Sequence, residues 1–235
     1  MEIKYIDRRT GNILIENPPK ERLLKFLYHH PFGRTAILPL VKQKFLSEFY
    51  GRKMNKLSSK NRIKNFVSLL DIDMTEAQKS INEFRTFNDF IYRELKPQMR
   101  VIQDGFVSPG DGKLIAFKNI SEIKNFYIKG QAFTIADFLN NKAFENIEND
   151  YSLLILRLAP NDYHRFHFPY NGLPSKPTQI KGHYLSVSPY ALVKDFCKVF
   201  CENKREYTTL STSEKGNIII VSVGATMMGS ITNTY

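Results

Sequence analysis

The chain has 235 residues, 42% hydrophobic and 13% aromatic, so it can bury one sizeable core and does not have the composition of a disordered chain. Its 34 Lys+Arg against 23 Asp+Glu give a formal net charge of +11, which favours an anionic partner: nucleic acid, an acidic substrate or an anionic membrane surface. No apolar run is long enough to span a bilayer, and the first 16 residues lack the pattern of a signal peptide.

The N-terminal part predicts a hairpin followed by basic amphipathic helices. Residues 1–16 alternate as two short strands, with residues 10–12 in the turn. Residues 19–50 group apolar side chains among many Lys and Arg, and Pro31 and Pro39 are expected to break this helical segment into pieces. A segment of this kind either packs on the protein's own core or lies at a lipid interface.

Residues 58–96 continue the helical pattern. A further helix is expected in the stretch "TFNDFIYRELKP", with its N-cap at Thr86 or Asn88. The apolar stripe of the earlier part is formed by Ile63, Phe66, Val67 and Leu70.

After Pro97 the pattern changes to short apolar runs separated by turn residues, which predicts strands of a mainly antiparallel β core. One short helix, around "TIADFLNN", is expected to interrupt them. The fold class is therefore α+β, with a helical N-terminal part over residues 1–96 and a β-rich body over residues 97–235. The runs read as strands are "FVSPGDGKLIAF", "NFYIKG", "YSLLILRLAP", "QIKGHYLSVSP", "REYTTLST" and "GNIIIVSVGA".

Two stretches hold the residues best suited to chemistry. "VSPGDGKL" places Asp111 between two glycines, where a tight turn is the structural alternative to a functional role. "APNDYHRFHFPYNG" places His164 and His167 three residues apart, so they face one site only if the backbone departs from a regular strand. A histidine titrates near neutral pH, and a carboxylate bound to one ring nitrogen fixes its tautomer. Asp111 and one of the two histidines could therefore form a base and its orienting partner.

Metal and nucleic-acid sites are not expected. His164, His167 and His183 would need a Glu or Cys at ligand spacing to make a metal site, and none follows. Cys197 and Cys201 lack a second pair and are interpreted as buried thiols in a reducing compartment. The basic residues are spread along the chain without a nucleic-acid-binding motif.

Seven segments, in order, resemble the phosphatidylserine decarboxylases. The resemblance covers essentially the whole chain and is most specific from Phe84 to Ile231. The segments that carry it are "FRTFNDFIYRELKPQMR", "VSPGDGKL", "IKGQAFTIADFL", "LRLAPNDYHRFHFPYNG", "GHYLSVSPYAL", "FCENKRE" and "VSVGATMMGSI".

The resemblance implies a lyase that converts phosphatidylserine to phosphatidylethanolamine and is made as a proenzyme. In this family a serine in a Gly-Ser bond attacks its preceding carbonyl, the ester breaks, and the serine becomes a pyruvoyl group at the start of a short α chain. The pyruvoyl carbonyl forms a Schiff base with the substrate amine and acts as an electron sink. No external cofactor is then needed.

The same resemblance assigns roles to three residues. The family's charge-relay aspartate corresponds to Asp111 and its charge-relay histidine to His167, which together would activate the serine for self-cleavage. His164 corresponds to the other histidine, and we expect it to protonate the carbon that has lost carbon dioxide. Arg165 would either meet an anionic headgroup or form a structural ion pair.

The expected partners are phosphatidylserine, an anionic membrane surface and the α chain that bears the pyruvoyl group. Because the substrate lies in a bilayer, the basic segment from Lys20 to Lys53 becomes a candidate for membrane docking. The expected location is peripheral, on the cytoplasmic face of the cell membrane. Nucleic acid is not expected as a partner, and a homodimer is left open.

One feature departs from the family pattern. The Gly-Ser-Thr cleavage motif should lie beyond Tyr235, and the Gly-Ser pair at Ser230 corresponds instead to an earlier Val-Gly-Ser-Ile strand of the family. The chain is therefore expected to correspond to the β-chain part of the proenzyme and to be inactive alone. The alternative is a non-catalytic remnant that binds anionic phospholipid.

Overall fold

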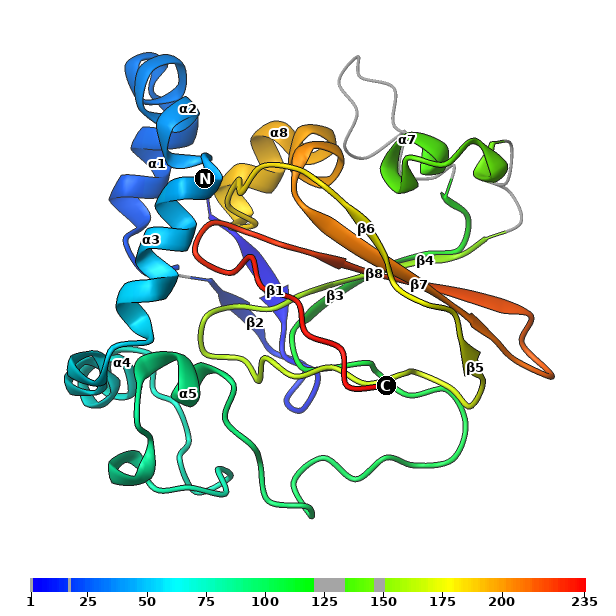
Figure 1. The fold of residues 1–235 in the computed structure, drawn as a ribbon, viewed down its shortest axis with the longest axis horizontal. Coiled ribbons are helices and arrows are strands. Elements are labelled where there is room, and N and C mark those ends of the chain that lie inside the picture. The colour runs from blue at the N-terminus through cyan, green and yellow to red at the C-terminus, as the bar shows by residue number, and fades with distance from the viewer. Residues whose placement is uncertain (1, 17, 121–133, 146–150) are drawn as a thin grey trace.

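The computed structural model describes residues 2–16, 18–120, 134–145 and 151–235. Its fold is α+β, which confirms the fold class predicted from the sequence (Figure 1). Helices α1 to α5 line one side of the molecule, the longer strands fill the other, and α7 and α8 lie at one end of these strands. The fold therefore places a helical surface next to a mostly antiparallel β body.

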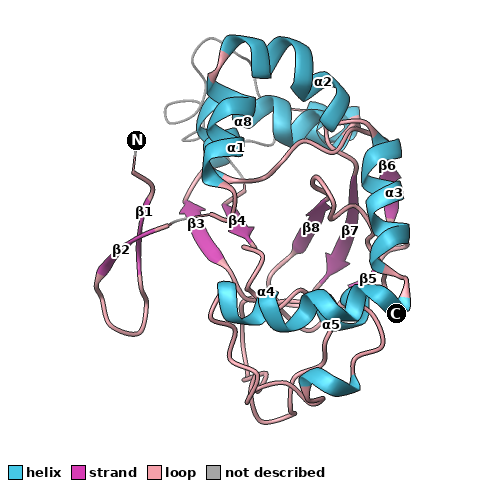
Figure 2. Cartoon of the chain, turned by 90° about the vertical axis from the view of Figure 1, so that its left-hand side faces the viewer, coloured by secondary structure: helices cyan, strands magenta, loops and turns pink. Residues whose placement is uncertain are grey.

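The predicted hairpin is present and packs on the β body. Strands β1 (Lys4–Ile6) and β2 (Ile13–Ile15) pair antiparallel, and Gly11 in the connecting turn has a φ of 72°. Figure 2 shows the hairpin beside β3 (Lys113–Phe117). An ion pair between Glu16 and Arg157 joins it to β4 (Leu153–Arg157), so the first residues of the chain contact strands that lie far along the sequence.

The helical part consists of short pieces. α1 ends before Pro31, as predicted, but the prediction that Pro39 breaks the segment is wrong. The Leu38 N–H donates a hydrogen bond to the Gly33 carbonyl in a π turn, and Pro39 follows at the start of α2. An N–H group at the start of a helix has no partner within the helix, so the lack of an N–H on Pro39 costs no hydrogen bond there. The pieces are α1 (Glu21–His29), the π-helix η1 (Gly33–Ile37), α2 (Leu38–Val41), α3 (Lys44–Met54), the 3-10 helix η2 (Leu57–Arg62), α4 (Ile63–Leu69), the 3-10 helix η3 (Ile81–Glu83) and α5 (Phe87–Ile91).

The predicted apolar stripe and cap after residue 58 are confirmed. Ile63 is buried, and Phe66, Val67 and Leu70 pack against its cluster. Thr86 is the N-cap of α5, and its hydroxyl accepts a hydrogen bond of 3.1 Å from the Asp89 N–H.

The strands form three sheets among the described residues. β1 pairs with β2, β3 pairs with β4, and β7 lies at the centre of a four-stranded sheet with β5, β6 and β8 as its neighbours. Every one of these pairings is antiparallel, as predicted. The strands not yet given are β5 (Leu173–Pro174), β6 (Thr178–Ile180), β7 (Arg205–Ser211) and β8 (Asn217–Val223).

Two of the predicted strand runs are strand over less than half of their length, and one run cannot be compared. In the run from Phe106 to Phe117, β3 begins only at Lys113, because the Pro-Gly-Asp-Gly turn precedes it. In the run that starts at Gln179, the strand ends at Ile180. The run over residues 125–130 lies outside the described residues.

The prediction of a single short helix in the β body is wrong. α7 (Ile135–Leu139), followed by the 3-10 helix η5 (Lys142–Phe144), matches it, but a longer helix, α8 (Pro189–Glu202), is present as well. Ser188 caps α8 and Pro189 begins it, a signal that the sequence reading did not use. α8 packs against α1, and an ion pair of 2.7 Å joins Arg34 to Asp195, where α8 is kinked.

Candidate active site

The turn around Asp111 and the histidine loop (residues 159–170) lie side by side through main-chain contacts. The Val107 N–H donates to the Pro169 carbonyl at 2.8 Å, and the His167 N–H donates to the Pro109 carbonyl at 2.9 Å. The histidine loop contains no strand. Its side chains therefore need not alternate between two faces, as they would in a strand, where residues three apart point to opposite sides. The structure thus brings together the two stretches that the sequence singled out.

The carboxylate of Asp111 binds an arginine that the sequence reading missed. Arg100 Nε donates to Oδ1 at 3.0 Å and Arg100 Nη2 donates to Oδ2 at 2.7 Å. The same guanidinium contacts Glu76, with Nη2 3.0 Å from Oε2. These two carboxylates raise the pKa of Arg100 above its ordinary value, Asp111 more than Glu76.

The side chains of Asp111 and His167 do not bond to each other in this arrangement. Where the chain is described, the imidazole of His167 makes no hydrogen bond, and its contact with the Asp111 turn is through the main chain. The carboxylate turns instead toward the Arg100 guanidinium, because a planar fork of N–H groups fits a carboxylate well. The main chains around Asp111 and His167 are therefore in contact, but no hydrogen bond joins the two side chains that were expected to form the relay pair.

His164 is half-buried and bound through one ring nitrogen. Its Nδ1 lies 2.8 Å from the carbonyl oxygen of Asp162. Burial lowers the pKa of His164 below the ordinary 6.5, the hydrogen bond to Asp162 acts against this, and the charge of Arg93 lowers the pKa further. His164 is thus biased toward the neutral form.

Arg93 is the second residue that the sequence reading missed. Its side chain is only 5% exposed, it lies 5.2 Å from the Phe90 ring centroid, and its Nη2 donates to the Asn161 carbonyl at 3.2 Å. Its Nη1 is the one buried side-chain nitrogen or oxygen without a partner in the part of the chain that the structure describes. A signal was available, because Arg93 follows the buried Phe90 by three residues and so lies on the apolar face of that helical turn.

Arg165 forms an ion pair, which was one of its two expected alternatives. Its Nη2 lies 3.0 Å from Glu94 Oε1, and its Nε donates to the Tyr92 carbonyl at 3.0 Å. A cavity of about 100 Å³ borders this contact. The residues that line it are Lys79, Phe84, Asp89, Tyr92, Arg93, Glu94 and Arg165.

The last residues of the chain lie beside the histidine loop. The ring centroids of Phe168 and Tyr235 are 4.9 Å apart, and the Tyr235 hydroxyl is 2.6 Å from Thr208 Oγ1. The hydroxyl of Ser230 lies 2.5 Å from that of Tyr92, and no hydrogen bond joins it to His164 or His167. The structure therefore pairs Ser230 with a tyrosine rather than with a base.

The other groups considered for metal chemistry lie apart from this site. The main-chain N–H of His183 donates to the Glu202 carbonyl at the end of α8. Cys201 is half-buried on α8. The side chain of Cys197 lies outside what the structure describes. Over residues 2–16, 18–120, 134–145 and 151–235, no three His, Cys, Asp or Glu side chains gather in a way that could hold a metal ion.

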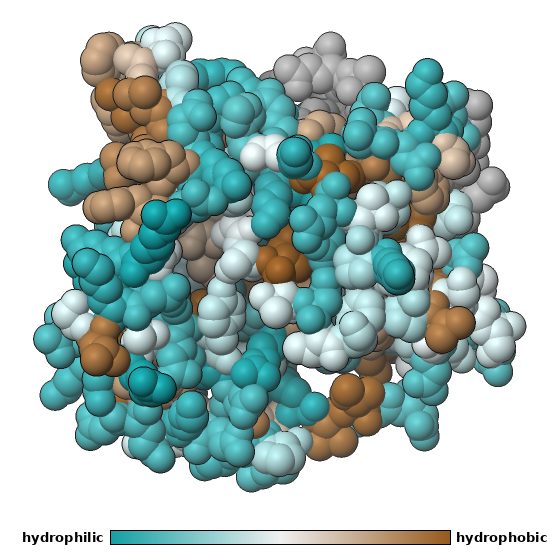
Figure 3. Space-filling view, in the orientation of Figure 1, coloured by the Kyte–Doolittle hydropathy of each residue, from teal (hydrophilic) through white to brown (hydrophobic). Residues whose placement is uncertain are grey.

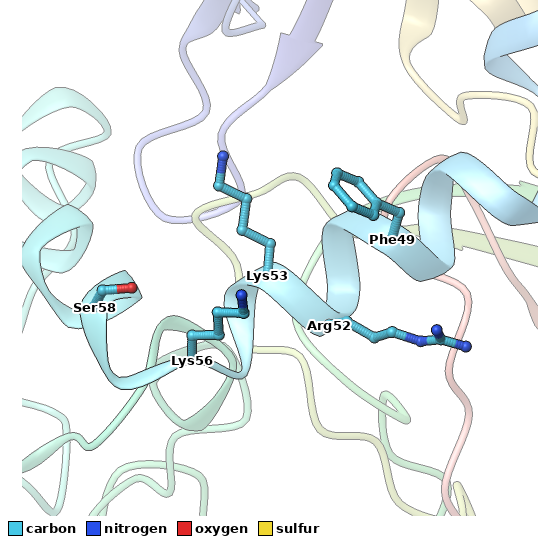
Figure 4. A pocket seen from close by; sticks show the side chains of 5 residues that line it. All are labelled: Phe49, Arg52, Lys53, Lys56 and Ser58. Carbon is cyan, nitrogen blue, oxygen red and sulfur yellow. The ribbon is translucent and has the colours of Figure 1, made fainter.

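A basic and apolar surface lies on α1 to α3, which we call the docking surface. Brown, hydrophobic side chains gather over these helices in Figure 3, at the upper left. An open hollow of about 580 Å³ lies where α3 leads into η2 (Figure 4). Its three cations form no ion pair with any described residue. The residues that line the hollow are Phe49, Arg52, Lys53, Lys56 and Ser58.

No helix in the described ranges combines the length and the apolar character that a membrane span requires. The exposed apolar side chains of the docking surface are Leu23, Phe26, Phe32, Leu40, Phe45, Leu46 and Phe49.

Comparisons with known proteins give a consistent result. A family model described as phosphatidylserine decarboxylase matches residues 87–235. A phosphatidylserine decarboxylase proenzyme from Fusobacterium nucleatum is 48% identical over 237 residues, covering 100% of this chain and 79% of the relative. Proenzymes of the same name from Desulfitobacterium hafniense and Clostridium botulinum are each 39% identical over 236 residues, covering 99% of this chain and 79% and 80% of the relatives.

Proposed function

The chain belongs to the phosphatidylserine decarboxylase family, and from this premise we propose that it acts on phosphatidylserine through a covalent pyruvoyl group. In this proposal the chain is the β-chain part of the proenzyme, and the serine that becomes the pyruvoyl group comes from the α-chain part. The product is phosphatidylethanolamine. The observation that best supports the proposal is the contact of the histidine loop with the Asp111 turn through the His167–Pro109 hydrogen bond.

We propose that Asp111 and His167 serve the self-cleavage step. The ring nitrogens of His167 have no partner among the described residues and are not shielded from solvent, so they are available to take a proton from an incoming serine hydroxyl. Asp111 would orient that imidazole. Each carboxylate oxygen offers two lone pairs. Among the described residues Oδ1 accepts only from Arg100 Nε, so it can accept a further hydrogen bond from His167.

We propose that His164 serves turnover. When present, the pyruvoyl group supplies an electron-withdrawing carbonyl that stabilises negative charge on the substrate carbon. The residues fit this chemistry, because two imidazoles on one loop each keep a ring nitrogen free for proton transfer. His164 would deliver a proton to the carbon that has lost carbon dioxide.

We propose that the docking surface brings this site to the substrate. Its exposed phenylalanines and unpaired cations have the composition of a segment that lies at an anionic lipid interface. We propose that the chain is a peripheral protein on the cytoplasmic face of the membrane. The alternative in which the same residues pack on the protein's own core does not describe Phe45 and Phe49, which are 71% and 60% exposed.

The test joins the chain to a C-terminal Gly-Ser-Thr segment and follows cleavage on a denaturing gel. His167→Ala should leave the joined protein uncut. His164→Ala should allow cleavage but slow the formation of phosphatidylethanolamine from phosphatidylserine vesicles. His183→Ala is the matched control, because that histidine is held at the end of α8 and should affect neither step.

The result also decides between the enzyme and a lipid-binding remnant. A remnant would bind phosphatidylserine vesicles but form no phosphatidylethanolamine with the added segment. Normal cleavage in the His167→Ala protein would refute the proposed base.

A further inference from the structure

Arg93 is a buried cation that has no carboxylate at ion-pair distance among the described residues. Its guanidinium contacts two main-chain carbonyls, the Asn161 oxygen at 3.2 Å and the Asp162 oxygen at 3.5 Å, and the face of Phe90. Burial lowers the pKa of this guanidinium, and the charges of Asp111, Glu76 and Asp162 act against that effect. A buried charge that lacks an oppositely charged partner and leaves one N–H group unbonded is costly to keep, so its retention needs an explanation.

Binding of an anionic ligand is a poor explanation. The orphan Nη1 is shielded from solvent, so a ligand cannot reach it in this arrangement. The nearby cavity is bordered by acidic residues as well as cations, and its Arg165 and Lys79 already pair with Glu94 and Asp89. The charge of Arg93 must therefore act on its neighbours through the protein.

The neighbour most directly placed to feel it is His164. The Asp162 carbonyl is shared between Arg93 Nη2, at 3.5 Å, and His164 Nδ1, at 2.8 Å. A carbonyl oxygen is only an acceptor, so Nδ1 must carry a proton to make this bond. The other ring nitrogen, Nε2, makes no hydrogen bond among the described residues and, unlike Arg93 Nη1, is not shielded from solvent.

We propose that Arg93 is a positioning residue that keeps His164 as a neutral imidazole, with its proton on Nδ1 and a bare Nε2 presented as a base. The shared Asp162 carbonyl fixes the tautomer, and the like charge of Arg93 disfavours a second proton. The charged groups that act on the imidazole are Arg93, from the segment after α5, and Asp162, from the histidine loop itself. The negative charges of Asp111 and Glu76 raise the pKa of Arg93.

This inference deepens the proposed role of His164 and rests on it. A neutral imidazole cannot donate from Nε2 until it has first accepted a proton there. The substrate brings one, because its amine is an ammonium group at neutral pH. The proton would move from the ammonium nitrogen to Nε2, giving imidazolium, and Nε2 would later return the same proton to the carbon that has lost carbon dioxide. The imidazole ends the cycle neutral, as it began.

The experiment follows the imidazole directly by ¹⁵N and ¹³C NMR of this chain in a pH titration, without any turnover. The chain has five histidines, and the signals of His164 are assigned by their loss in His164→Gln. In the wild type we expect a protonated Nδ1, a bare Nε2 and a pKa below 6.5.

Two variants separate charge from hydrogen bonding. Arg93→Gln keeps a donor but removes the charge, and it should raise the pKa of His164, because one like charge near the imidazole is lost. Arg93→Lys keeps the charge and should leave that pKa close to the wild-type value. The main-chain amide signal of His183, which is bonded to the Glu202 carbonyl at the end of α8, should be the same in all three proteins and serves as an internal control.

Two results would overturn the inference. One is a wild-type His164 with its proton on Nε2, a measurement that needs no variant to fold. The other is an unchanged pKa in Arg93→Gln with the amide signals of residues 161–164 in place. Because neither measurement involves decarboxylation, failure here is distinct from failure of the proposed function, which would appear as missing phosphatidylethanolamine.

Discussion

Two neighbouring helical regions use similar residues in opposite ways. The docking surface, on α1 to α3, leaves Phe45 71% exposed. The region from η2 to α5 buries its aromatic residues, and Phe84 and Phe90 meet edge to face with their centroids 5.5 Å apart. The comparison teaches that apolar spacing along a helix does not reveal whether the apolar side faces protein or solvent.

The two regions are also expected to have different roles. The segment that follows α5 supplies Arg93 and Tyr92 to the histidine loop, so this helix must be fixed in place. The docking surface makes no contact of this kind in the described residues and would need only to face a bilayer. Substitutions should therefore act on stability in the first region and on lipid binding in the second.

The largest expected effect tests the buried side. Phe90→Ala should lower the free energy of unfolding by about 3–5 kcal/mol, because Phe90 is fully buried and packs on Phe84 and Arg93. Phe45→Ala is the matched control and should have little effect. Urea unfolding measures both. Equal losses in the two proteins would mean that the regions do not differ in packing.

The second effect tests the exposed side. Phe45→Ser should weaken binding to phosphatidylserine vesicles by about tenfold, the amount expected when most of one aromatic side chain no longer enters the interface. Leu69→Ser, in α4, is the control, because Leu69 is 74% exposed but lies outside the docking surface. Vesicle sedimentation measures both, and an equal loss for Leu69→Ser would remove the distinction between the two surfaces.

The smallest effect compares two helix starts. Thr86→Ala should destabilise the protein by about 1 kcal/mol, because it removes the hydroxyl that caps α5. The N-cap of α3, Gln43, makes no capping bond through its side chain, and Gln43→Ala should change little. Thermal unfolding compares them, and indistinguishable midpoints for the two variants would show that the cap does not contribute.

Much of this fold could be predicted, because its signals are local. The stripe at Ile63 follows from helical spacing, and the cap at Thr86 from the chemistry of a threonine oxygen at a helix start. Pro39 and α8 were missed for different reasons. A π turn placed Pro39 where no N–H was required, and α8 starts at a Ser-Pro signal inside a region dominated by strands.

The candidate site was predictable in its backbone but not in its ion pairs. Asp111 and the two histidines could be found because their residue types suggest chemistry. Arg100 binds Asp111 because of the way residues 97–100 fold back, and a lone arginine in a polar stretch gives no sign of that contact. Arg93 was more accessible to prediction, since an arginine in phase with Phe90 has to be explained by a partner inside the protein.

The histidine loop is attached to the Asp111 turn through main-chain atoms, which any residue except proline at positions 107 and 167 would supply. The bonds from the His167 N–H to Pro109 and from the Val107 N–H to Pro169 involve no imidazole or carboxylate. Placement and reactivity are thus encoded independently here. A different side chain grafted at position 164 or 167 would inherit the same location, and this part of the molecule is a natural frame for installing new proton-transfer groups.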